Sequence, residues 1–181
     1  MVLSGSDKQI LTALDIYVEA LESPNSSREL VAAIRPVLRD WIECPGAPTY
    51  HLTQVLTGHG CFGEYLFRVV RREPTAECHH CVSGIVDTAR HTREECPAWA
   101  VPRAAVSTVI GADLSLPAMV RAMSGSEQAW RVVATFADIV MSAKEAAERE
   151  REDSVDSLPI RRRRPGRRRR AHLVAIDRAP P

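Results

Sequence analysis

The segment ECHHCVSGIVDTARHTREEC, residues 77–96, contains three of the five cysteines and three of the six histidines of this 181-residue chain. Cys78 and Cys81 are separated by two residues, the spacing that lets two thiolates hold one ion from a tight turn. His91 follows after nine residues and Cys96 after four more. The pattern C-x2-C-x9-H-x4-C predicts a closed structural zinc site, because Zn²⁺ in such sites takes four tetrahedral sulfur and imidazole ligands.

The five-residue step from His91 to Cys96 constrains the backbone between them. Residues 87–96 favour a helix, in which side chains three or four positions apart share a face. We therefore expect the helical turn to loosen near its end, before Pro97, so that both side chains can reach one ion.

A redox cysteine pair and a chance cluster in a cysteine-tolerant loop are the alternatives to zinc binding. A redox pair is disfavoured because no strand-then-helix pattern precedes Cys78 and because two histidines lie between the cysteines. We expect His79 and His80 to be exposed or to lie behind the ligands, with His80 better suited to touch nucleic acid. Cys61, on an apolar helical face, is predicted to be a core residue, and Cys44 a free loop thiol.

Length and composition are typical of one small domain with tails. Hydrophobic residues make up 45% of the chain but aromatic residues only 5%, so we expect a thin aliphatic core that a metal supports. No apolar run approaches the roughly 18 residues that span a bilayer, and residues 1–20 lack the features of a signal peptide. The sequence therefore predicts a protein of the nucleus or cytoplasm, neither secreted nor membrane-bound. The odd number of cysteines favours free or metal-bound thiols over disulfides.

Helical periodicity recurs along the chain, and no strand pattern is evident. The predicted helices span residues 26–42, 52–72, 97–111, 115–125 and 126–152. Pro36 should kink or divide the first, and Gly58 and Gly60 should break the second. The last helix carries an apolar stripe made of Trp130, Val133, Phe136, Ala137, Val140 and Met141. This stripe fades into residues 144–156, which we expect to be solvated.

The predicted fold class is mainly α: a small helical domain stapled by one CCHC zinc site, with a disordered basic C-terminal tail. Residues 1–27 form a weakly patterned segment, residues 28–152 the helical domain with the zinc motif, and residues 153–181 an acidic and then arginine-rich tail. Residues 158–181 hold nine arginines and one aspartate, a balance of +8, whereas residues 1–157 carry a balance of −7. This segregation indicates a polyanionic partner for the tail and not for the whole body.

The block LPIRRRRPGRRRR, residues 158–170, places eight arginines around a Pro-Gly break. Each guanidinium stays charged and can fork onto phosphate oxygens, so the block predicts binding of RNA or DNA, mainly through the phosphate backbone. The predicted contact residues are Arg161, Arg162, Arg163, Arg164, Arg167, Arg168, Arg169 and Arg170. The block also matches a nuclear import patch, and a merely solvated tail is the alternative. We expect the acidic residues 148–157 to fold back on the arginines when no ligand is bound.

Several segments, taken in order, carry a family resemblance: HLTQVLTGHGCFGEYLFRV, ECHHC, HTREECPAWA, IGADLSLPAMVRAM, and MSAKEAAERERE with the arginine block behind it. Over about residues 28–170 the chain resembles the carboxy-terminal region of the reverse transcriptase polyprotein of non-LTR (LINE-type) retrotransposons. In that family the region lies downstream of the polymerase domain and contains a CCHC zinc motif associated with nucleic-acid contact. The resemblance implies zinc ligands at Cys78, Cys81, His91 and Cys96.

The catalytic parts of such a polyprotein are not evident in this chain. A reverse transcriptase needs a carboxylate cluster that binds two metal ions, whereas the acidic pairs here are Glu94-Glu95, beside the cysteine cluster, and Glu152-Asp153, at a helix end. An endonuclease portion is missing as well. We therefore expect no enzymatic activity from this chain alone, and the resemblance implies a fragment, an element's remnant or a host gene derived from one.

Two classes of function remain open. The first is a zinc-stabilised module whose arginine tail binds RNA or DNA. The second is a zinc-stabilised structural domain that docks on another protein, such as a separate reverse transcriptase domain. The salt dependence of nucleic-acid binding, measured with and without residues 158–181, distinguishes the two.

Overall fold

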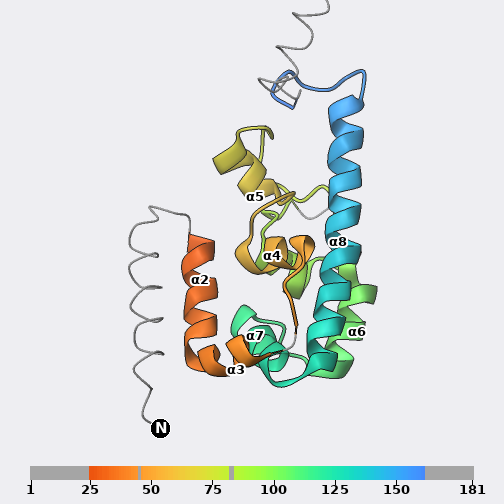
Figure 1. The fold of residues 1–181 in the computed structure, drawn as a ribbon. Helices are drawn as coiled ribbons and strands as arrows, with labels where there is room; N and C mark the ends of the chain where they lie inside the picture. The colour runs from red at the N-terminus through yellow and green to blue at the C-terminus, as the bar shows by residue number, and fades with distance from the viewer. Residues whose placement is uncertain (1–24, 45, 82–83, 162–181) are drawn as a thin grey trace, which may run out of the picture.

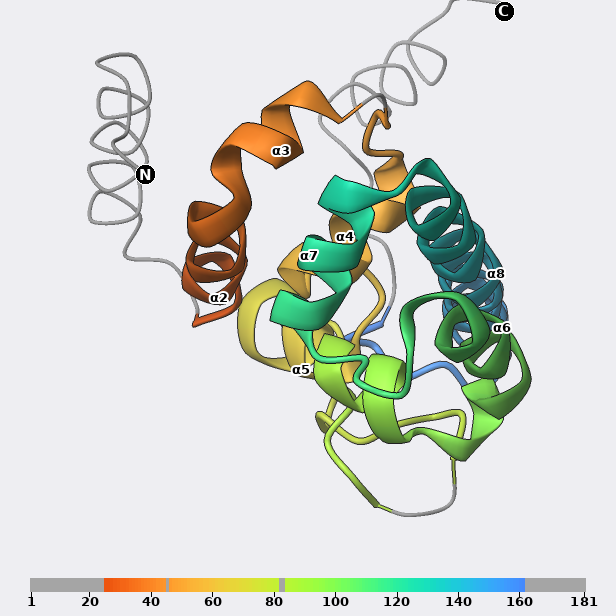
Figure 2. The same cartoon turned by 90° about the horizontal axis from the view of Figure 1, so that it is seen from below.

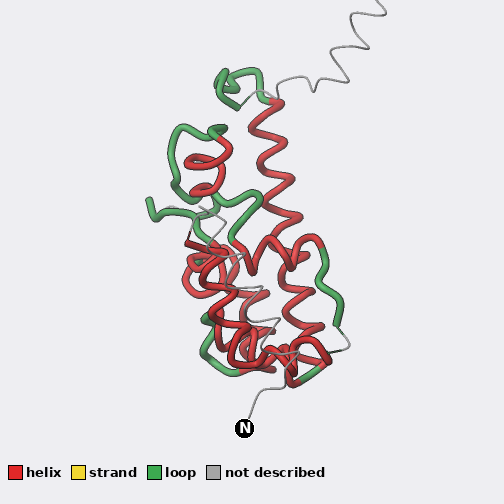
Figure 3. Tube along the Cα trace, turned by 60° about the vertical axis from the view of Figure 1, so that its left-hand side comes forward, coloured by secondary structure: helices red, strands yellow, loops and turns green. Residues whose placement is uncertain are grey.

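The computed structural model describes residues 25–44, 46–81 and 84–161. Within these ranges the chain is helical and forms no strand (Figure 3), apart from one isolated antiparallel β-bridge between Glu77 and Val86. The predicted mainly α class is thus confirmed. The expected disorder of the basic tail concerns residues that, from 162 onward, lie outside the described ranges.

The first predicted helix is divided at Pro36, as we expected from its sequence. Helix α2 spans Asn25–Ile34, a 3₁₀ turn spans Arg35–Val37, and α3 spans Leu38–Glu43. Pro36 lies in the 3₁₀ turn, where it has no amide hydrogen to continue the α-helical hydrogen bonds. Both helices pack against α7, which spans Leu116–Gly125 (Figure 2).

The second predicted helix is broken at its glycines. Helix α4 spans Tyr50–Thr57 and ends at Gly58, whose φ of 72° is the left-handed conformation that glycine adopts without strain. The chain resumes as the short α5, Gly63–Tyr65, and continues as a π-helical turn over Leu66–Val70. This break turns the chain back toward the segment that holds the cysteine cluster.

The longest helix, α8, forms one side of the molecule (Figure 1) and packs against α4, α6 and α7. It spans Glu127–Asp153, and α6 spans Ala100–Ile110 behind a 3₁₀ turn at Pro97–Trp99. The Ser126 hydroxyl accepts a hydrogen bond from the Ala129 amide at 3.3 Å and caps α8. The predicted apolar stripe is buried at every position, namely Trp130, Val133, Phe136, Ala137, Val140 and Met141.

The second half of α8 differs from its prediction. Residues 144–156 were expected to be solvated, yet Lys144 is only 1% exposed. Lys144 lies three and four positions beyond Met141 and Val140, so it continues the buried face of the helix. Asp87 supplies the carboxylate that neutralises the lysine, and the rings of Phe62 and Trp99 lie 5.2 and 6.0 Å from its Nζ. The expectation of a solvated stretch is therefore wrong at Lys144.

None of the helices in the described part of the chain combines the length and apolar character that a membrane span requires.

Candidate metal centre

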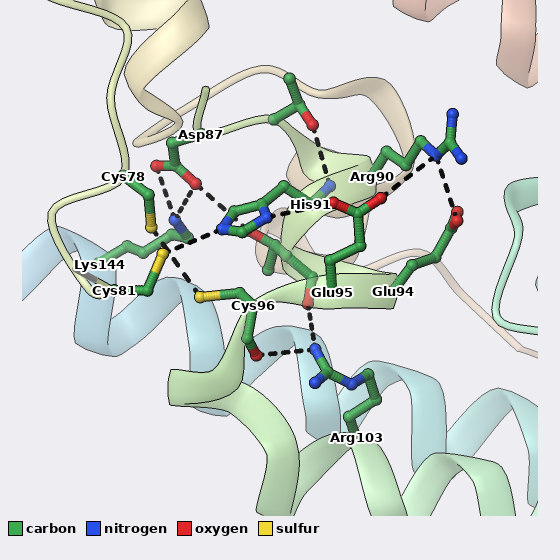
Figure 4. Close-up of polar contacts among 12 residues, drawn as sticks. Cys78, Cys81, Asp87, Arg90, His91, Glu94, Glu95, Cys96, Arg103 and Lys144 are labelled. Atoms are coloured by element: carbon green, nitrogen blue, oxygen red, sulfur yellow. Dashed lines mark hydrogen bonds and ion pairs between the residues drawn. The ribbon is translucent and has the colours of Figure 1, made fainter. Parts of the chain in front are cut away.

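Four side chains that are separated in the sequence by up to 18 residues converge on one point (Figure 4). The sulfurs of Cys78, Cys81 and Cys96 and one ring nitrogen of His91 all lie within 4.8 Å of one another. Cys78 Sγ and Cys96 Sγ are 3.9 Å apart, and Cys81 Sγ lies 3.4 Å from His91 Nε2. Tetrahedral coordination of Zn²⁺ requires about 3.8 Å between two sulfurs and about 3.5 Å between sulfur and nitrogen. The four side chains therefore form a cluster that fits one metal ion.

The expected loosening of the helix between His91 and Cys96 is present. Residues His91–Glu95 form a π-helical turn, and the Cys96 amide donates to the His91 carbonyl at 2.7 Å, across five residues instead of four. This wider turn places the two side chains on the same side of the backbone. Arg103 of α6 fixes the end of the turn, because its Nη1 donates to the Cys96 carbonyl at 2.9 Å.

The loop that carries the other two cysteines is closed at its base by backbone hydrogen bonds. The Cys78 amide donates to Ile85 and the Asp87 amide donates to Ala76, each at 2.8 Å. Burial raises the pKa of Cys78 to about 12, although backbone hydrogen bonds from His80 and Cys81 act in the opposite direction. Burial likewise raises the pKa of Cys96. Buried thiolates need a compensating cation, and a metal ion would supply it.

His91 is oriented for coordination through Nε2. This nitrogen faces Cys81, whereas Nδ1 is buried and has no hydrogen-bond partner within the described residues. A carboxylate oxygen of Glu95 lies 3.6 Å from Nδ1. In metal sites the non-coordinating nitrogen commonly donates to such a carboxylate, which fixes the tautomer. The ring is thus positioned as a metal ligand with Glu95 behind it.

A buried ion pair lies beside the cluster, and the sequence analysis missed it. Lys144 Nζ of α8 donates to both carboxylate oxygens of Asp87, at 2.7 and 2.8 Å. Asp87 also accepts from the Gly63 amide at 3.0 Å, and Lys144 lies 5.2 Å from the centre of the Phe62 ring. We call the loop that is closed between Ala76 and Asp87 the metal loop. Through Asp87, the ion pair connects this loop to α8 and α5. The only sequence signal was that position 144 continues the apolar stripe of α8.

The remaining cysteines and histidines lie outside the cluster. The His80 ring lies against the Trp99 ring, with ring centres 4.9 Å apart and planes tilted by 52°, and burial lowers the pKa of His80 to about 4. His79 Nε2 lies 3.5 Å from Glu73. The half-buried Cys61 thiol donates to a Glu148 oxygen at 2.8 Å and packs against the core. Cys44 is also half-buried, with its thiol 3.4 Å from the Met123 carbonyl.

Of the eight arginines predicted to contact nucleic acid, Arg161 is the one that the structure describes. Its Nε and Nη2 donate to one oxygen of the buried Glu73, at 2.9 and 2.8 Å, and Arg151 of α8 binds the other oxygen at 3.2 Å. Although burial acts to raise the pKa of Glu73, hydrogen bonds from His79 and Arg161 and the charge of Arg151 lower it to about 2. We expected the acidic residues 148–157 to fold back on the arginine block. Arg161 instead pairs with Glu73, which lies outside that acidic segment.

The other seven predicted contacts, Arg162, Arg163, Arg164, Arg167, Arg168, Arg169 and Arg170, lie outside the described residues.

Comparison with known proteins supports the family resemblance. Over 142 residues, 77% of its length, the chain is 29% identical to the "Retrovirus-related Pol polyprotein from type-1 retrotransposable element R1 4" of Nasonia vitripennis. The aligned region covers 34% of that protein, so the chain spans about a third of the length of the curated relative that it matches. No protein-family model and no solved structure matches the chain. The predicted relationship to a retrotransposon polyprotein is confirmed.

Proposed function

We propose that the chain is a zinc-binding helical module that binds RNA or DNA, with the metal stabilising the fold and the arginine block supplying most of the affinity. The observation that carries the proposal is the convergence of four ligand atoms within 4.8 Å at the spacings of a tetrahedral site. The relative from the retrotransposable element supports the same assignment, because such an element replicates through nucleic acid.

Zinc is the metal that these ligands favour. Three thiolates and one imidazole suit Zn²⁺, whereas carboxylate and carbonyl oxygens suit Mg²⁺ or Ca²⁺. Four protein ligands complete a tetrahedral shell and leave no position for water or substrate. We therefore assign the ion a structural role and expect no catalysis by this chain alone.

Charge distribution supports the division of labour between tail and body. Residues 158–181 carry a balance of +8 and residues 1–157 a balance of −7. Because phosphate contacts dominate nonspecific affinity for nucleic acid, the net-acidic body should contribute mainly local contacts. Arg161, the first residue of the arginine block, binds Glu73, which also lies 3.5 Å from His79 Nε2.

Metal analysis of the purified protein tests the ligand assignment. We expect one zinc per chain, and Cys78→Ser or Cys96→Ser should lose both the zinc and helical content. Cys61→Ser is the matched control, because this thiol is half-buried beside Glu148 and not in the cluster. Protein without zinc at neutral pH, or loss of zinc in the control, would contradict the assignment.

Salt-dependent binding of a single-stranded oligonucleotide tests the role of the tail. If the arginines neutralise about six phosphates, the log-log salt slope should be near −4. Deleting residues 162–181 should flatten this slope while retaining Arg161 and its contact with Glu73. Replacing the deleted arginines by lysines in the full chain is the matched control, because lysine keeps the charge and should preserve much of the slope.

Two other results would change the proposal. If the truncated protein binds as tightly and with the same slope, the metal-bound body is the binding surface. If neither protein binds nucleic acid, the alternative of a zinc-stabilised protein-interaction domain is favoured.

A further inference from the structure

A cavity of about 430 Å³ is lined by residues of α2, α4, α5 and the two π-helical turns. Its positive lining consists of Arg68, Arg90 and Arg93, and its negative lining of Glu29 and Glu64. A volume of this size falls in the range of small-ligand sites. The described residues that line the cavity include neither Arg161 nor any of the four residues of the metal cluster.

Arg93 is the unusual member of this lining. Its side chain is 96% buried, yet Nε has no hydrogen-bond partner within the described residues. Nη1 donates to the Val55 carbonyl at 3.3 Å, and the nearest recorded carboxylate oxygen, from Glu94, lies 3.8 Å from Nη2. Leaving a buried guanidinium donor such as Nε unpaired is costly. An anion in the cavity would accept a hydrogen bond from it.

The other two arginines lie nearer the solvent and already have partners. Arg68 and Arg90 have side chains that are 66% and 72% exposed. Arg68 lies 3.4 Å from Glu64, and Arg90 lies 3.2 Å from Glu94. Exposed pairs of this kind contribute little energy and rearrange easily. The cavity thus combines a buried guanidinium, whose Nε lacks a hydrogen-bond partner among the described residues, with two exposed ones.

The rest of the lining is apolar and aromatic. Leu56, Phe62, Tyr65 and Leu116 border the same cavity. Tyr65 is partly exposed and its ring lies 4.8 Å from the His59 ring. Sites for single-stranded nucleic acid combine cationic side chains for the phosphate with an aromatic ring on which a base can stack. An inorganic anion would need only the arginines and would leave the apolar wall unused.

We propose that this cavity binds one nucleotide of a single-stranded nucleic acid, with a phosphate on Arg93 and the base beside Tyr65. A duplex would not fit, because its bases are already paired and stacked and cannot enter a cavity of this size. The inference rests on the proposed function for the class of ligand. It adds a second binding site that is independent of the arginine block.

The test uses the zinc-loaded full chain and a short single-stranded oligonucleotide that contains 5-bromodeoxyuridine. After irradiation, mass spectrometry locates the crosslinked peptide, which we expect to contain Tyr65. Tyr65→Leu should remove this crosslink and weaken binding about tenfold, the contribution of one stacked base. Tyr50→Leu is the matched control, because Tyr50 is 70% exposed and also lies beside a histidine ring, 5.5 Å away.

A second pair of variants tests the contribution of Arg68, an exposed arginine of the cavity lining. Arg68→Ala should weaken binding several-fold more than Arg131→Ala. The two arginines are matched, because Arg131 is 72% exposed and pairs with Glu127 four residues away, as Arg68 pairs with Glu64. Equal effects of the two substitutions would show that only net charge matters and would overturn the proposal.

The outcomes separate this inference from the proposed function. Crosslinks confined to the arginine block or the metal loop would overturn the cavity site and leave nucleic-acid binding intact, whereas a full chain that binds no oligonucleotide would overturn both. The Arg93 Nε–H resonance provides a direct measurement: it should shift on addition of thymidine monophosphate and not of thymidine. A shift with a glutamate-rich peptide and not with the nucleotide would identify a carboxylate ligand and overturn the proposal.

Discussion

The two halves of α8 are held in the molecule by different interactions. The first half buries Trp130, Val133 and Phe136, with the Trp130 ring against that of Trp41 in α3, and it depends on the removal of apolar surface from water. The second half buries Lys144 against Asp87 and places Arg151 against Glu73. One helix thus joins an apolar core to a polar region organised around the metal cluster.

This difference predicts which half of α8 would tolerate loss of the proposed metal. Apolar packing is nondirectional and needs no further ligand. A buried ion pair has a large desolvation cost, and it is favourable only while the surrounding geometry holds both charges in place. The segment that supplies Asp87 and Glu73 also leads into and out of the metal loop. We therefore expect the polar half to depend on the metal and the apolar half to be less affected.

Removal of the metal should give the largest loss of folding free energy. Binding of Zn²⁺ by sites of this type contributes on the order of 10 kcal/mol to folding. After chelation, hydrogen exchange should accelerate in the metal loop and in residues 144–153 far more than in residues 129–141. Uniform acceleration along α8 would show that the helix is one cooperative unit and would contradict the comparison.

Lys144→Met should give the next largest loss of unfolding free energy. Removing one member of a buried ion pair leaves Asp87 uncompensated and should cost about 3–5 kcal/mol of unfolding free energy. Denaturant unfolding of the zinc-loaded protein measures this loss. The double variant Lys144→Met, Asp87→Leu is the control, because removing both charges should recover much of the stability. No recovery would show that the pair is needed for its geometry and not only for its charge balance.

Met119→Ala tests the apolar core that the first half of α8 shares with α7. Met119 is 1% exposed in α7, and truncation should cost about 3 kcal/mol through lost burial and a residual cavity. We expect this variant to retain its zinc affinity, as measured by competition with a chelator. A parallel loss of zinc affinity would mean that the two halves are coupled more tightly than their contacts indicate.

Glu73→Gln should give the smallest loss of unfolding free energy, and the size of this loss should depend on pH. The folded-state pKa of Glu73 is lowered to about 2 from an ordinary value of 4.5, so the folded protein binds the proton less readily than the unfolded chain. The carboxylate therefore stabilises the fold above pH 4.5, and this contribution falls as the pH drops from 4.5 toward 2. Unfolding of wild type and variant from pH 7 to 4 should show a difference that narrows below about pH 4.5. A constant difference would contradict the lowered pKa.

Much of the helical framework and of the Cys/His cluster could be predicted from the sequence. The stripe of α8 follows from a spacing of three and four residues, and the divisions at Pro36 and Gly58 follow from their backbone restrictions. The ligand cluster was also predictable, because the C-x2-C spacing is a local property and the step from His91 to Cys96 needs only a wider turn. Each of these inferences concerns residues that are close together in the chain.

The polar half depended on contacts that no local pattern specifies. Lys144 and Asp87 are 57 positions apart, and Arg161 and Glu73 are 88 apart. In the sequence, Lys144 begins a charged run and Arg161 begins an arginine block, and charged runs usually indicate solvent exposure. Only the packing of the metal loop on α8 shows that these two charges have buried partners.

The sequence by itself determined the helical class, the apolar face of α8 and the four members of the Cys/His cluster, because periodicity and ligand spacing act over a few residues. The tertiary structure decided which charged residues are buried and paired, and it brought Tyr65, Arg68 and Arg93 to one cavity. The physical reason is that a charge is stable in the interior only beside a partner of opposite sign, and the fold determines which distant residue becomes that partner.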